Sequence, residues 1–276
     1  MDNYNYFRFP GFLTKACTLS YDDGVFDDIR LIEIMRKHGL KGTFNLNSCH
    51  LVAGGTETHL GPDAIKELFG EDTEIALHGY SHLPLGRISP SLMVRDVVSN
   101  KEQLEETFEK VIRGMAYAYG TYSDEAVEIL RLCDVAYSRT TETTEAFDLP
   151  EDWLRLHPTC HHKNPRLFEL VDKFLEPTPS KPMQITPKLF YLWGHSYEFP
   201  RDDNWDVIEK FAEIMGSRDD VWHATNMQIY EYVEAFKRLR FSSAFTYVEN
   251  PSATDVYMTI RGKNILAKAG AVTKTR

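Results

Sequence analysis

Hydrophobic and polar positions follow two different rhythms along the chain. Short apolar runs of strand-forming residues are separated by longer stretches in which apolar residues recur three or four positions apart, as on one face of a helix. This alternation is typical of parallel strands connected by crossover helices. The strands are predicted over 16–19, 42–45, 74–77, 115–118, 135–138, 154–157, 189–193 and 221–224.

The helices between these strands carry recognisable start and stop signals. Apolar residues occupy one side of 27–38, and Gly39 follows, as glycine does at a helix C-terminus. Ser89 and Pro90 are typical of an N-cap and a first helical position, and apolar residues then recur at roughly helical spacing as far as Val111. Further helices are predicted over 123–132 and 205–215.

The number of strand–helix units in a chain of 276 residues predicts an irregular α/β barrel, a (β/α) barrel of about seven parallel strands. We expect this barrel to span 1–240, with 241–276 as a small C-terminal β segment packed on it in one structural unit. The turn signals and strand-forming residues of this last part lie at 250–251, 261–262 and 256–260. In barrels of this kind the catalytic groups lie at the C-terminal ends of the strands.

The charge balance limits the expected partners. The sequence has 31 basic and 41 acidic residues, a net charge of −10 and a pI near 5.5. This excess of acidic residues argues against nucleic acid and anionic membranes, so neutral sugars or small molecules are the expected ligands. The first residues lack the basic and apolar parts of a signal peptide, and no apolar run has membrane-spanning length, which predicts a cytoplasmic protein. The four cysteines have no metal-binding spacing, and the oligomeric state stays open.

Two adjacent carboxylates follow the first predicted strand, in the segment S-Y-D-D-G at 20–24. One of them, Asp22 or Asp23, can bind a divalent cation while the other accepts a proton from water. Two like charges held this close also favour a nearby cation. The residues alone allow a second interpretation, an Asp-Gly turn between a strand and a helix.

Two histidines four residues apart, His78 and His82, follow the third predicted strand in H-G-Y-S-H. Gly79 stands where the H-E-x-x-H motif of metalloproteases has its glutamate base, so that class is not favoured. Taken alone, such a pair is more often solvated or buried in a core. Together with the adjacent aspartates, however, it gives three ligands and a position open for water, the pattern of a catalytic metal site.

The two motifs together resemble those of the polysaccharide deacetylase family, the NodB-homology domain of carbohydrate esterase family 4. S-Y-D-D-G is similar to the family's T-F-D-D-G, and H-G-Y-S-H to its H-[ST]-x-x-H. The resemblance implies a NodB-type barrel in which Asp22 is the general base. It also implies that Asp23, His78 and His82 hold one divalent metal ion. Zinc is the expected ion, with Co²⁺, Ni²⁺ or Mn²⁺ as alternatives.

A third family motif, R-x-P-Y, corresponds to A-Y-A-Y-G at 116–120. Tyr119 is retained, and the resemblance implies that its backbone N–H stabilises an oxyanion. Ala116 replaces the arginine that pairs with the base in the family. Arg139, after the next predicted strand, is the candidate to supply this charge, and a structural role is equally compatible with the sequence.

The segment L-W-G-H-S at 192–196 resembles the family's L-x-H segment. The resemblance implies that His195 is the general acid that protonates the leaving amine. Trp193 is a candidate for the wall of the substrate pocket, with a place in the apolar core as the alternative.

Three more residues are candidates for substrate binding. Asp152 resembles the aspartate of an aspartate–tryptophan pair in the family, with a helix cap as the alternative. His161 and His162 follow a predicted strand, and because adjacent side chains point in different directions, at most one is expected to meet the metal or the substrate.

These residues predict a metal-dependent hydrolase that removes an N-acetyl or O-acetyl group from a carbohydrate. Its expected partner is an acetylated carbohydrate or a small-molecule substrate. Two alternatives on the same fold stay open: a hydrolase of a non-peptide C–N bond in a cyclic amide or ureide, and a catalytically inactive saccharide-binding protein.

Overall fold

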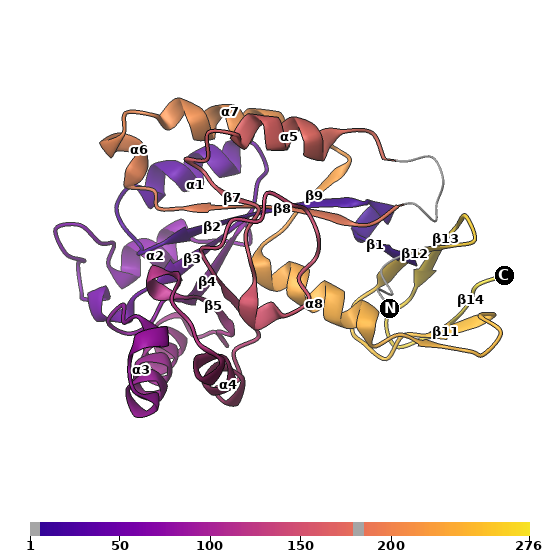
Figure 1. Ribbon diagram of the computed structural model, residues 1–276, viewed down its shortest axis with the longest axis horizontal. Coiled ribbons are helices and arrows are strands. Elements are labelled where there is room, and N and C mark those ends of the chain that lie inside the picture. Colours follow the sequence, from indigo (N-terminus) through magenta and orange to yellow (C-terminus); the bar gives the residue numbers. More distant parts are fainter. Residues whose placement is uncertain (1–5, 179–184) are drawn as a thin grey trace.

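The computed structural model describes residues 6–178 and 185–276 (Figure 1). A sheet of eight strands forms its centre, in the order β6-β5-β4-β3-β2-β8-β7, and β9 also pairs with β2. Its strands are β2 (Lys15–Asp22), β3 (Gly42–Leu46), β4 (Thr73–Leu77), β5 (Gly114–Ala116), β6 (Tyr137–Arg139), β7 (Cys160–His161), β8 (Lys188–Gly194) and β9 (Val221–His223). Every ladder in this sheet is parallel, as the alternation of strands and helices predicts.

Strand β2 is the centre of the sheet. One of its edges pairs with β8 over seven residues, and its other edge pairs with β9 near its start and with β3 near its end. All eight residues of β2 are buried. The turn after Asp22 is therefore surrounded by the ends of the neighbouring strands.

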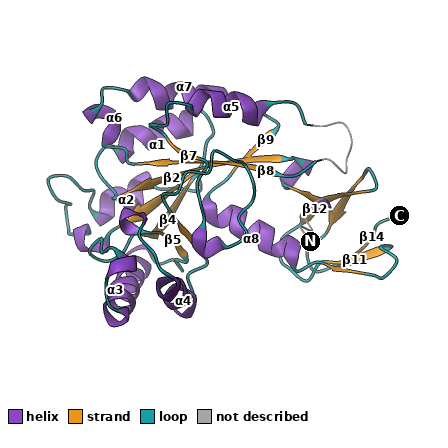
Figure 2. Cartoon of the chain, viewed as in Figure 1, coloured by secondary structure: helices purple, strands orange, loops and turns teal. Residues whose placement is uncertain are grey.

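Helices cover the sheet, and Figures 1 and 2 show α1, α5, α6 and α7 on one side of it and α3 and α4 on the other. The helices are α1 (Asp28–Lys37), α2 (Pro62–Leu68), α3 (Pro90–Phe108), α4 (Asp124–Leu132), α5 (Leu167–Leu175), α6 (Glu198–Arg201), α7 (Trp205–Gly216) and α8 (Asn226–Lys237). The predicted helices over 27–38, 123–132 and 205–215 are confirmed. Within 6–178 and 185–276, no helix combines the length and the apolar character needed to cross a membrane.

The predicted continuation of α3 to Val111 is wrong. The helix ends at Phe108 because Glu109 adopts a left-handed conformation (φ 53°), which breaks the series of helical hydrogen bonds. Val111 lies beyond this break with 81 % of its surface exposed, so its apolar side chain does not continue the buried face of the helix.

The strand predicted over 154–157 is also wrong. Residues 153–155 form a 3₁₀ turn, and the chain then crosses from one strand to another. Leu156 exchanges backbone hydrogen bonds with β6, whereas Thr159 and His162 donate to the backbone of β8. Pro158, which has no N–H to donate, lies at this crossing. The segment thus spans the space between β6 and β8, and the short strand β7 forms only after the crossing.

Two small antiparallel sheets lie at the end of the molecule that carries both described termini (Figure 1). One contains β1 (Phe7–Arg8), β12 (Val256–Ile260) and β13 (Lys263–Ala267), and the other β10 (Arg240–Phe241), β11 (Tyr247–Glu249) and β14 (Val272–Lys274). The predicted turn at 261–262 joins β12 to β13, and both turn residues have positive φ, as two-residue hairpins prefer. The division of the chain at residue 240 stays a prediction, and β1 joins the C-terminal strands in one sheet.

Candidate active site

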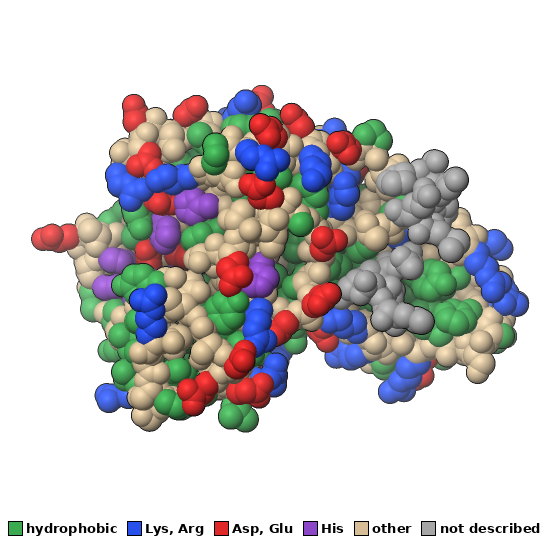
Figure 3. Space-filling view, viewed as in Figure 1, with side chains coloured by type: hydrophobic (Ala, Val, Ile, Leu, Met, Phe, Trp, Pro, Cys, Tyr) green, Lys and Arg blue, Asp and Glu red, His purple; other side chains and the backbone are tan. Residues whose placement is uncertain are grey.

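The candidate residues come together where the parallel strands end. Asp22 is the last residue of β2, His78 follows β4, and His195 follows β8. Because neighbouring parallel strands point the same way, these three ends share one edge of the sheet. Figure 3 shows histidine side chains gathered on this face of the molecule, with acidic side chains among them.

Three of the candidate side chains converge on one point. Nε2 of His78 lies 3.7 Å from Oδ1 of Asp23, and Nε2 of His82 lies 3.8 Å from the same oxygen. All three atoms lie within 4.8 Å of one another. Ligands about 2.1 Å from a tetrahedral zinc ion are roughly 3.4 Å apart, so the spacing is close to that of a metal site.

The protonation of the two imidazoles suits a metal. Nδ1 of His78 lies 2.9 Å from the carbonyl oxygen of Ala116, and since a carbonyl only accepts, Nδ1 carries the proton and Nε2 keeps its lone pair toward Asp23. Burial lowers the pKa of His82, and the neighbouring His78 lowers it further, so this ring is neutral at pH 7. The donor set therefore fits a divalent ion such as zinc.

Buried amide side chains hold the loop that carries the first histidine. Asn100, on α3, accepts a hydrogen bond from the backbone N–H of His78 and donates one to the carbonyl of Leu46. Asn47 donates to the carbonyls of His78 and Gly79. Both asparagines are almost completely buried, so these bonds do not compete with water.

Asp96, also on α3, fixes the rest of this loop. Its Oδ1 accepts hydrogen bonds from the backbone N–H and the hydroxyl of Ser81. Gly79 has a φ of 82°, and a Cβ at this position would lie 2.5 Å from Oδ2 of Asp96, so only glycine fits here. Asp23 and His82 themselves have φ values of 84° and 56°, a left-handed conformation that is strained for side chains of this kind and is typical of functional sites.

Asp22 is held as an ionised carboxylate. Nη2 of Arg139 donates a hydrogen bond to its Oδ2, and Nδ2 of Asn45 donates to its Oδ1 at 2.8 Å. Burial by itself raises the pKa of Asp22, but the positive charge of Arg139, supported by His195, outweighs burial and holds the pKa well below its usual range. Oδ2 of Asp22 also lies 3.7 Å from Nε2 of His78, at the edge of the metal-binding cluster.

Arg139 reaches Asp22 from the strand next to the one that carries Ala116. The register of the β5–β6 ladder pairs Ala116 directly with Arg139. The guanidinium is completely buried and stacks over the ring of Trp193, with 4.3 Å between its central carbon and the ring centroid. Trp193 thus lies in the buried wall beside the site, in contact with the arginine.

His195 faces Asp22 from the opposite side. Its Nε2 lies 3.8 Å from Oδ2 of Asp22, and its Nδ1 lies 3.5 Å from Oε2 of Glu198. Burial lowers the pKa of His195, but the carboxylates of Glu198, Asp22 and Asp23 more than compensate, and the pKa is raised. A histidine with a raised pKa keeps its proton at neutral pH and can donate it.

The sequence is similar to that of a known protein family. Residues 12–138 match the family model of the polysaccharide deacetylases. This part of the chain, a little under half of its length, is similar to the polysaccharide deacetylases. A search among curated proteins finds no match to the sequence.

Solved structures share the fold of the deacetylase family. A protein of Mycobacterium smegmatis, provisionally assigned as a polysaccharide deacetylase, has a TM-score of 0.57 and 17% identity over 84% of this chain and 94% of that chain. A family 4 carbohydrate esterase from Streptomyces lividans, in complex with acetate, has a TM-score of 0.53 and 9% identity over 77% and 93%. A family 4 pseudoenzyme from Bacillus anthracis has a TM-score of 0.52 and 16% identity over 81% and 68%. The predicted NodB-type irregular (β/α) barrel is confirmed.

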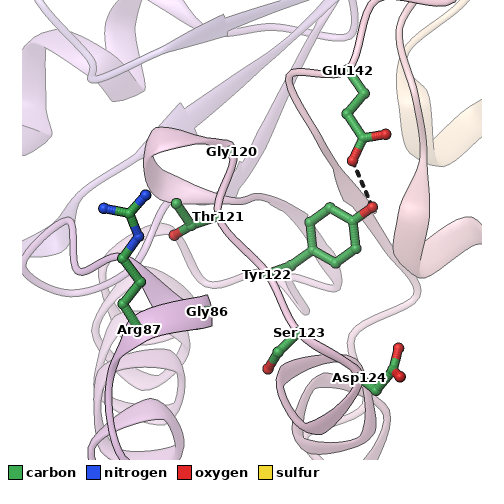
Figure 4. A pocket seen from close by; sticks show the side chains of 8 residues that line it. All are labelled: Gly86, Arg87, Gly120, Thr121, Tyr122, Ser123, Asp124 and Glu142. Carbon is green, nitrogen blue, oxygen red and sulfur yellow. Dashed lines mark hydrogen bonds between the residues drawn. The ribbon is translucent and has the colours of Figure 1, made fainter.

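The third deacetylase motif forms a tight turn at the rim of the site. Tyr119 has a φ of 57°, and its ring, 66 % exposed, lies 4.4 Å from the ring of His82. A cavity of about 600 Å³ opens beside this turn, lined on one side by Arg87 and on the other by Glu142, which accepts a hydrogen bond from Tyr122 (Figure 4). Gly120, the neighbour of Tyr119, lines this cavity, whereas the residues of the metal-binding cluster do not.

The remaining candidates lie in different places. Asp152 caps the 3₁₀ turn at 153–155 by accepting from the backbone N–H of Leu154, and its other hydrogen bond is with Arg155. His161 faces the site, with its ring 6.4 Å from that of His195. His162 is buried, with its ring stacked beside Phe199. The expectation that these side chains point in different directions is wrong: their rings lie 4.4 Å apart, and both Nε2 atoms approach Oε2 of Glu198, at 3.0 and 3.4 Å.

Sequence reasoning missed five polar residues that hold the site together. They are Asn45, Asn47, Asp96, Asn100 and Glu198. Only Glu198 has a visible signal, because it comes three residues after His195 and thus shares one side of a helical turn with it. The other four lie in segments with no motif of their own.

Proposed function

We propose that this protein is a divalent-metal-dependent hydrolase that removes an acetyl group from a carbohydrate. The observation that carries the proposal is the position of Asp22. This ionised carboxylate is held by Arg139 and Asn45 within 3.7 Å of the ring of His78, beside three converging ligand atoms. A base next to a metal-binding cluster is what hydrolysis of an unactivated amide or ester requires.

Asp23, His78 and His82 would hold the ion. When bound there, a divalent ion supplies Lewis acidity that polarises the acetyl carbonyl and makes water more acidic. Zinc is the first ion to test, because two imidazoles and a carboxylate suit it.

The chain's own residues carry the protons. Asp22 accepts a proton from the attacking water, and its low pKa ensures that it is ionised before the reaction begins. The backbone N–H of Tyr119 is assigned to the developing oxyanion. His195, on the other side of Asp22, donates a proton to the departing nitrogen or oxygen of the sugar, so that water and the acetylated sugar yield acetate and the free sugar.

Metal content and acetate release test this proposal together. Wild type should contain about one divalent ion per chain after zinc is offered, and it should release acetate from N-acetylglucosamine oligomers or acetylated xylan. His78→Ala should lose both the metal and the activity. His38→Ala, a matched change at the C-terminal end of α1, should retain both.

Asp22→Asn separates the base from the ligands. It should keep the metal and lower acetate release at least 10²-fold, since general base catalysis contributes about this much or more. Near-normal turnover by this variant would rule out Asp22 as the base. A wild type that binds metal and hydrolyses a cyclic ureide but no acetylated sugar would assign the site to the other substrate class.

A further inference from the structure

Glu198 is the meeting point of a charged cluster behind His195. Its Oε2 lies 3.0 Å from Nε2 of His161 and 3.5 Å from Nδ1 of His195. Its other oxygen, Oε1, lies 3.1 Å from Nη2 of Arg201 and 3.7 Å from Nζ of Lys163. Nε2 of the buried His162 also lies 3.4 Å from Oε2. The carboxylate is thus turned so that one oxygen meets three histidines and the other meets the two cations.

The proton positions on His161 follow from its second contact. The backbone N–H of Lys163 donates to Nδ1 of His161 at 3.1 Å, so Nδ1 must carry a lone pair. The proton of the neutral ring is then on Nε2, which faces Glu198. His161 therefore presents its N–H to the carboxylate, 3.0 Å away, and its Nε2 has no lone pair to offer a cation.

The same carboxylate oxygen determines which ring nitrogen of His195 carries the proton when the ring is neutral. A carboxylate facing Nδ1 keeps a proton there, so Nε2 is the nitrogen that takes up and gives away the second proton. Nε2 is also the nitrogen that faces Asp22, at 3.8 Å. The proton to be donated is thereby placed on the side of His195 that faces the reacting groups.

We propose that Glu198 is the positioning residue of the general acid: it fixes the tautomer of His195, while His161 fixes Glu198. This inference rests on the proposed function, since it takes His195 as the proton donor. It adds a His161–Glu198–His195 chain that the family motifs do not contain, built from the last residue of β7, the first residue of α6 and the residue that follows β8.

Glu198→Gln tests the proposal without a change of size. Arg201 and Lys163 are both donors, so they would hold the amide oxygen and turn the amide NH₂ toward the histidines. A donor would then face Nδ1 of His195, which favours the wrong tautomer. Asp202→Asn is the matched control, because Asp202 carries a neighbouring carboxylate that pairs with Lys163 and Arg201.

The first measurement is the tautomer itself. Long-range ¹H–¹⁵N spectra of zinc-loaded protein with ¹⁵N-labelled histidine report which ring nitrogen carries the proton, and His161→Gln and His195→Gln identify the two signals. At a pH high enough to leave both rings neutral, we expect protonated Nδ1 on His195 and protonated Nε2 on His161 in wild type and Asp202→Asn. In Glu198→Gln, we expect the proton of His195 to move to Nε2. An unchanged His195 signal in Glu198→Gln would overturn the proposal.

The second measurement compares leaving groups. Release of acetate from an N-acetylglucosamine oligomer needs a proton donor, whereas 4-nitrophenyl acetate has a leaving group that departs without one. Glu198→Gln should lower kcat for the oligomer about 10²-fold and change that for 4-nitrophenyl acetate little. Equal loss with both substrates would show a merely structural role and overturn the proposal.

Two further outcomes separate this inference from the proposed function. If wild type releases acetate from neither probe, the proposed function fails, and the spectra still decide whether Glu198 sets the tautomer of His195. If wild type binds two metal ions and Glu198→Gln binds one, then His161, His195 and Glu198 form a second metal site, and the proposal is overturned.

Discussion

The candidate site has two halves, and different kinds of residue hold them in place. The metal side contains Asp22 and the metal-binding cluster, and the acid side contains His195 and its neighbours. On the metal side, the loops that carry Asp22 and His78 are held mainly by neutral partners, including the buried amides of Asn45, Asn47 and Asn100. On the acid side, His195 faces a carboxylate that is itself surrounded by imidazoles and cations.

This difference suits the function proposed for each half, which is metal binding on one side and proton transfer on the other. Neutral amides keep the same hydrogen bonds over a wide pH range, so they fix ligand positions in advance. A histidine whose neighbours are charged has a protonation state that the neighbours set, which suits proton transfer. Arg139 and Asp96 are the exceptions, because Arg139 donates to Asp22 and the carboxyl group of Asp96 accepts from Ser81.

The largest effect is expected for Arg139→Gln. Removal of this buried guanidinium leaves Asp22 without its cation, so we expect a loss of about 3–5 kcal/mol in the free energy of unfolding. The pKa of Asp22 would rise, and acetate release at pH 7 should fall on the order of 10²-fold or more. Urea unfolding and acetate assays measure the two losses.

The register between β5 and β6 allows a second variant to restore the activity that is lost with Arg139. Ala116 pairs with Arg139, so an arginine returned to position 116 comes from the same level of the sheet. Ala116→Arg combined with Arg139→Ala should recover part of the activity that Arg139→Ala loses. If Arg139→Gln were as stable and as active as wild type, the metal side would not depend on a charge.

A smaller effect is expected for Asp96→Ala. The change removes the acceptor for the backbone N–H and hydroxyl of Ser81, so the loop that carries His78 and His82 loses its anchor on α3. Loss of such a supporting contact typically weakens metal binding by about 10–100-fold. Competition with a zinc chelator measures the affinity. Asp96→Asn, which keeps an accepting oxygen, should bind more tightly than Asp96→Ala, and equal affinities would contradict the anchoring role.

The same contrast explains how much the sequence could predict. The candidate metal ligands lie in two short motifs, so their residue types and spacing are visible in the sequence. Their anchors are scattered: Asn100 and Asp96 become neighbours of the motif only when α3 packs against β4. Contact between Arg139 and Asp22 likewise depends on the register of β6 beside β5, which no local pattern contains.

Errors in the predicted elements also have local causes. The apolar run at 154–157 satisfies a strand pattern, but the chain there crosses from β6 to β8, and Pro158 was the only signal of the break. Helix α8 was not predicted, although Thr225 and Gln228 form a capping box at its start. Helix α5 was not predicted either, although its buried residues recur at helical spacing.

The smallest expected effect is on the free energy of unfolding at low pH, and it comes from a buried histidine on the acid side. Burial, together with the neighbouring His161, lowers the pKa of His162 to about 3, although Glu198 opposes the shift. Because the unfolded chain takes up this proton near pH 6.5 and the folded chain only near pH 3, stability is fully present above pH 6.5 and is lost as the pH falls toward 3. His162 therefore makes the fold sensitive to acid.

His162→Phe should remove this part of the acid sensitivity. The ring of His162 stacks on Phe199 and lies against Gly194, where a Cβ would come within 2.1 Å of its Nδ1, so an aromatic ring of similar size fits the space. Between pH 7 and pH 4.5, metal-free wild type should lose about 2 kcal/mol more of its free energy of unfolding than the variant. Urea unfolding of both proteins at the two pH values measures this difference. Equal losses would show that His162 is protonated in the folded chain, and the acid side would then carry one more positive charge behind His195.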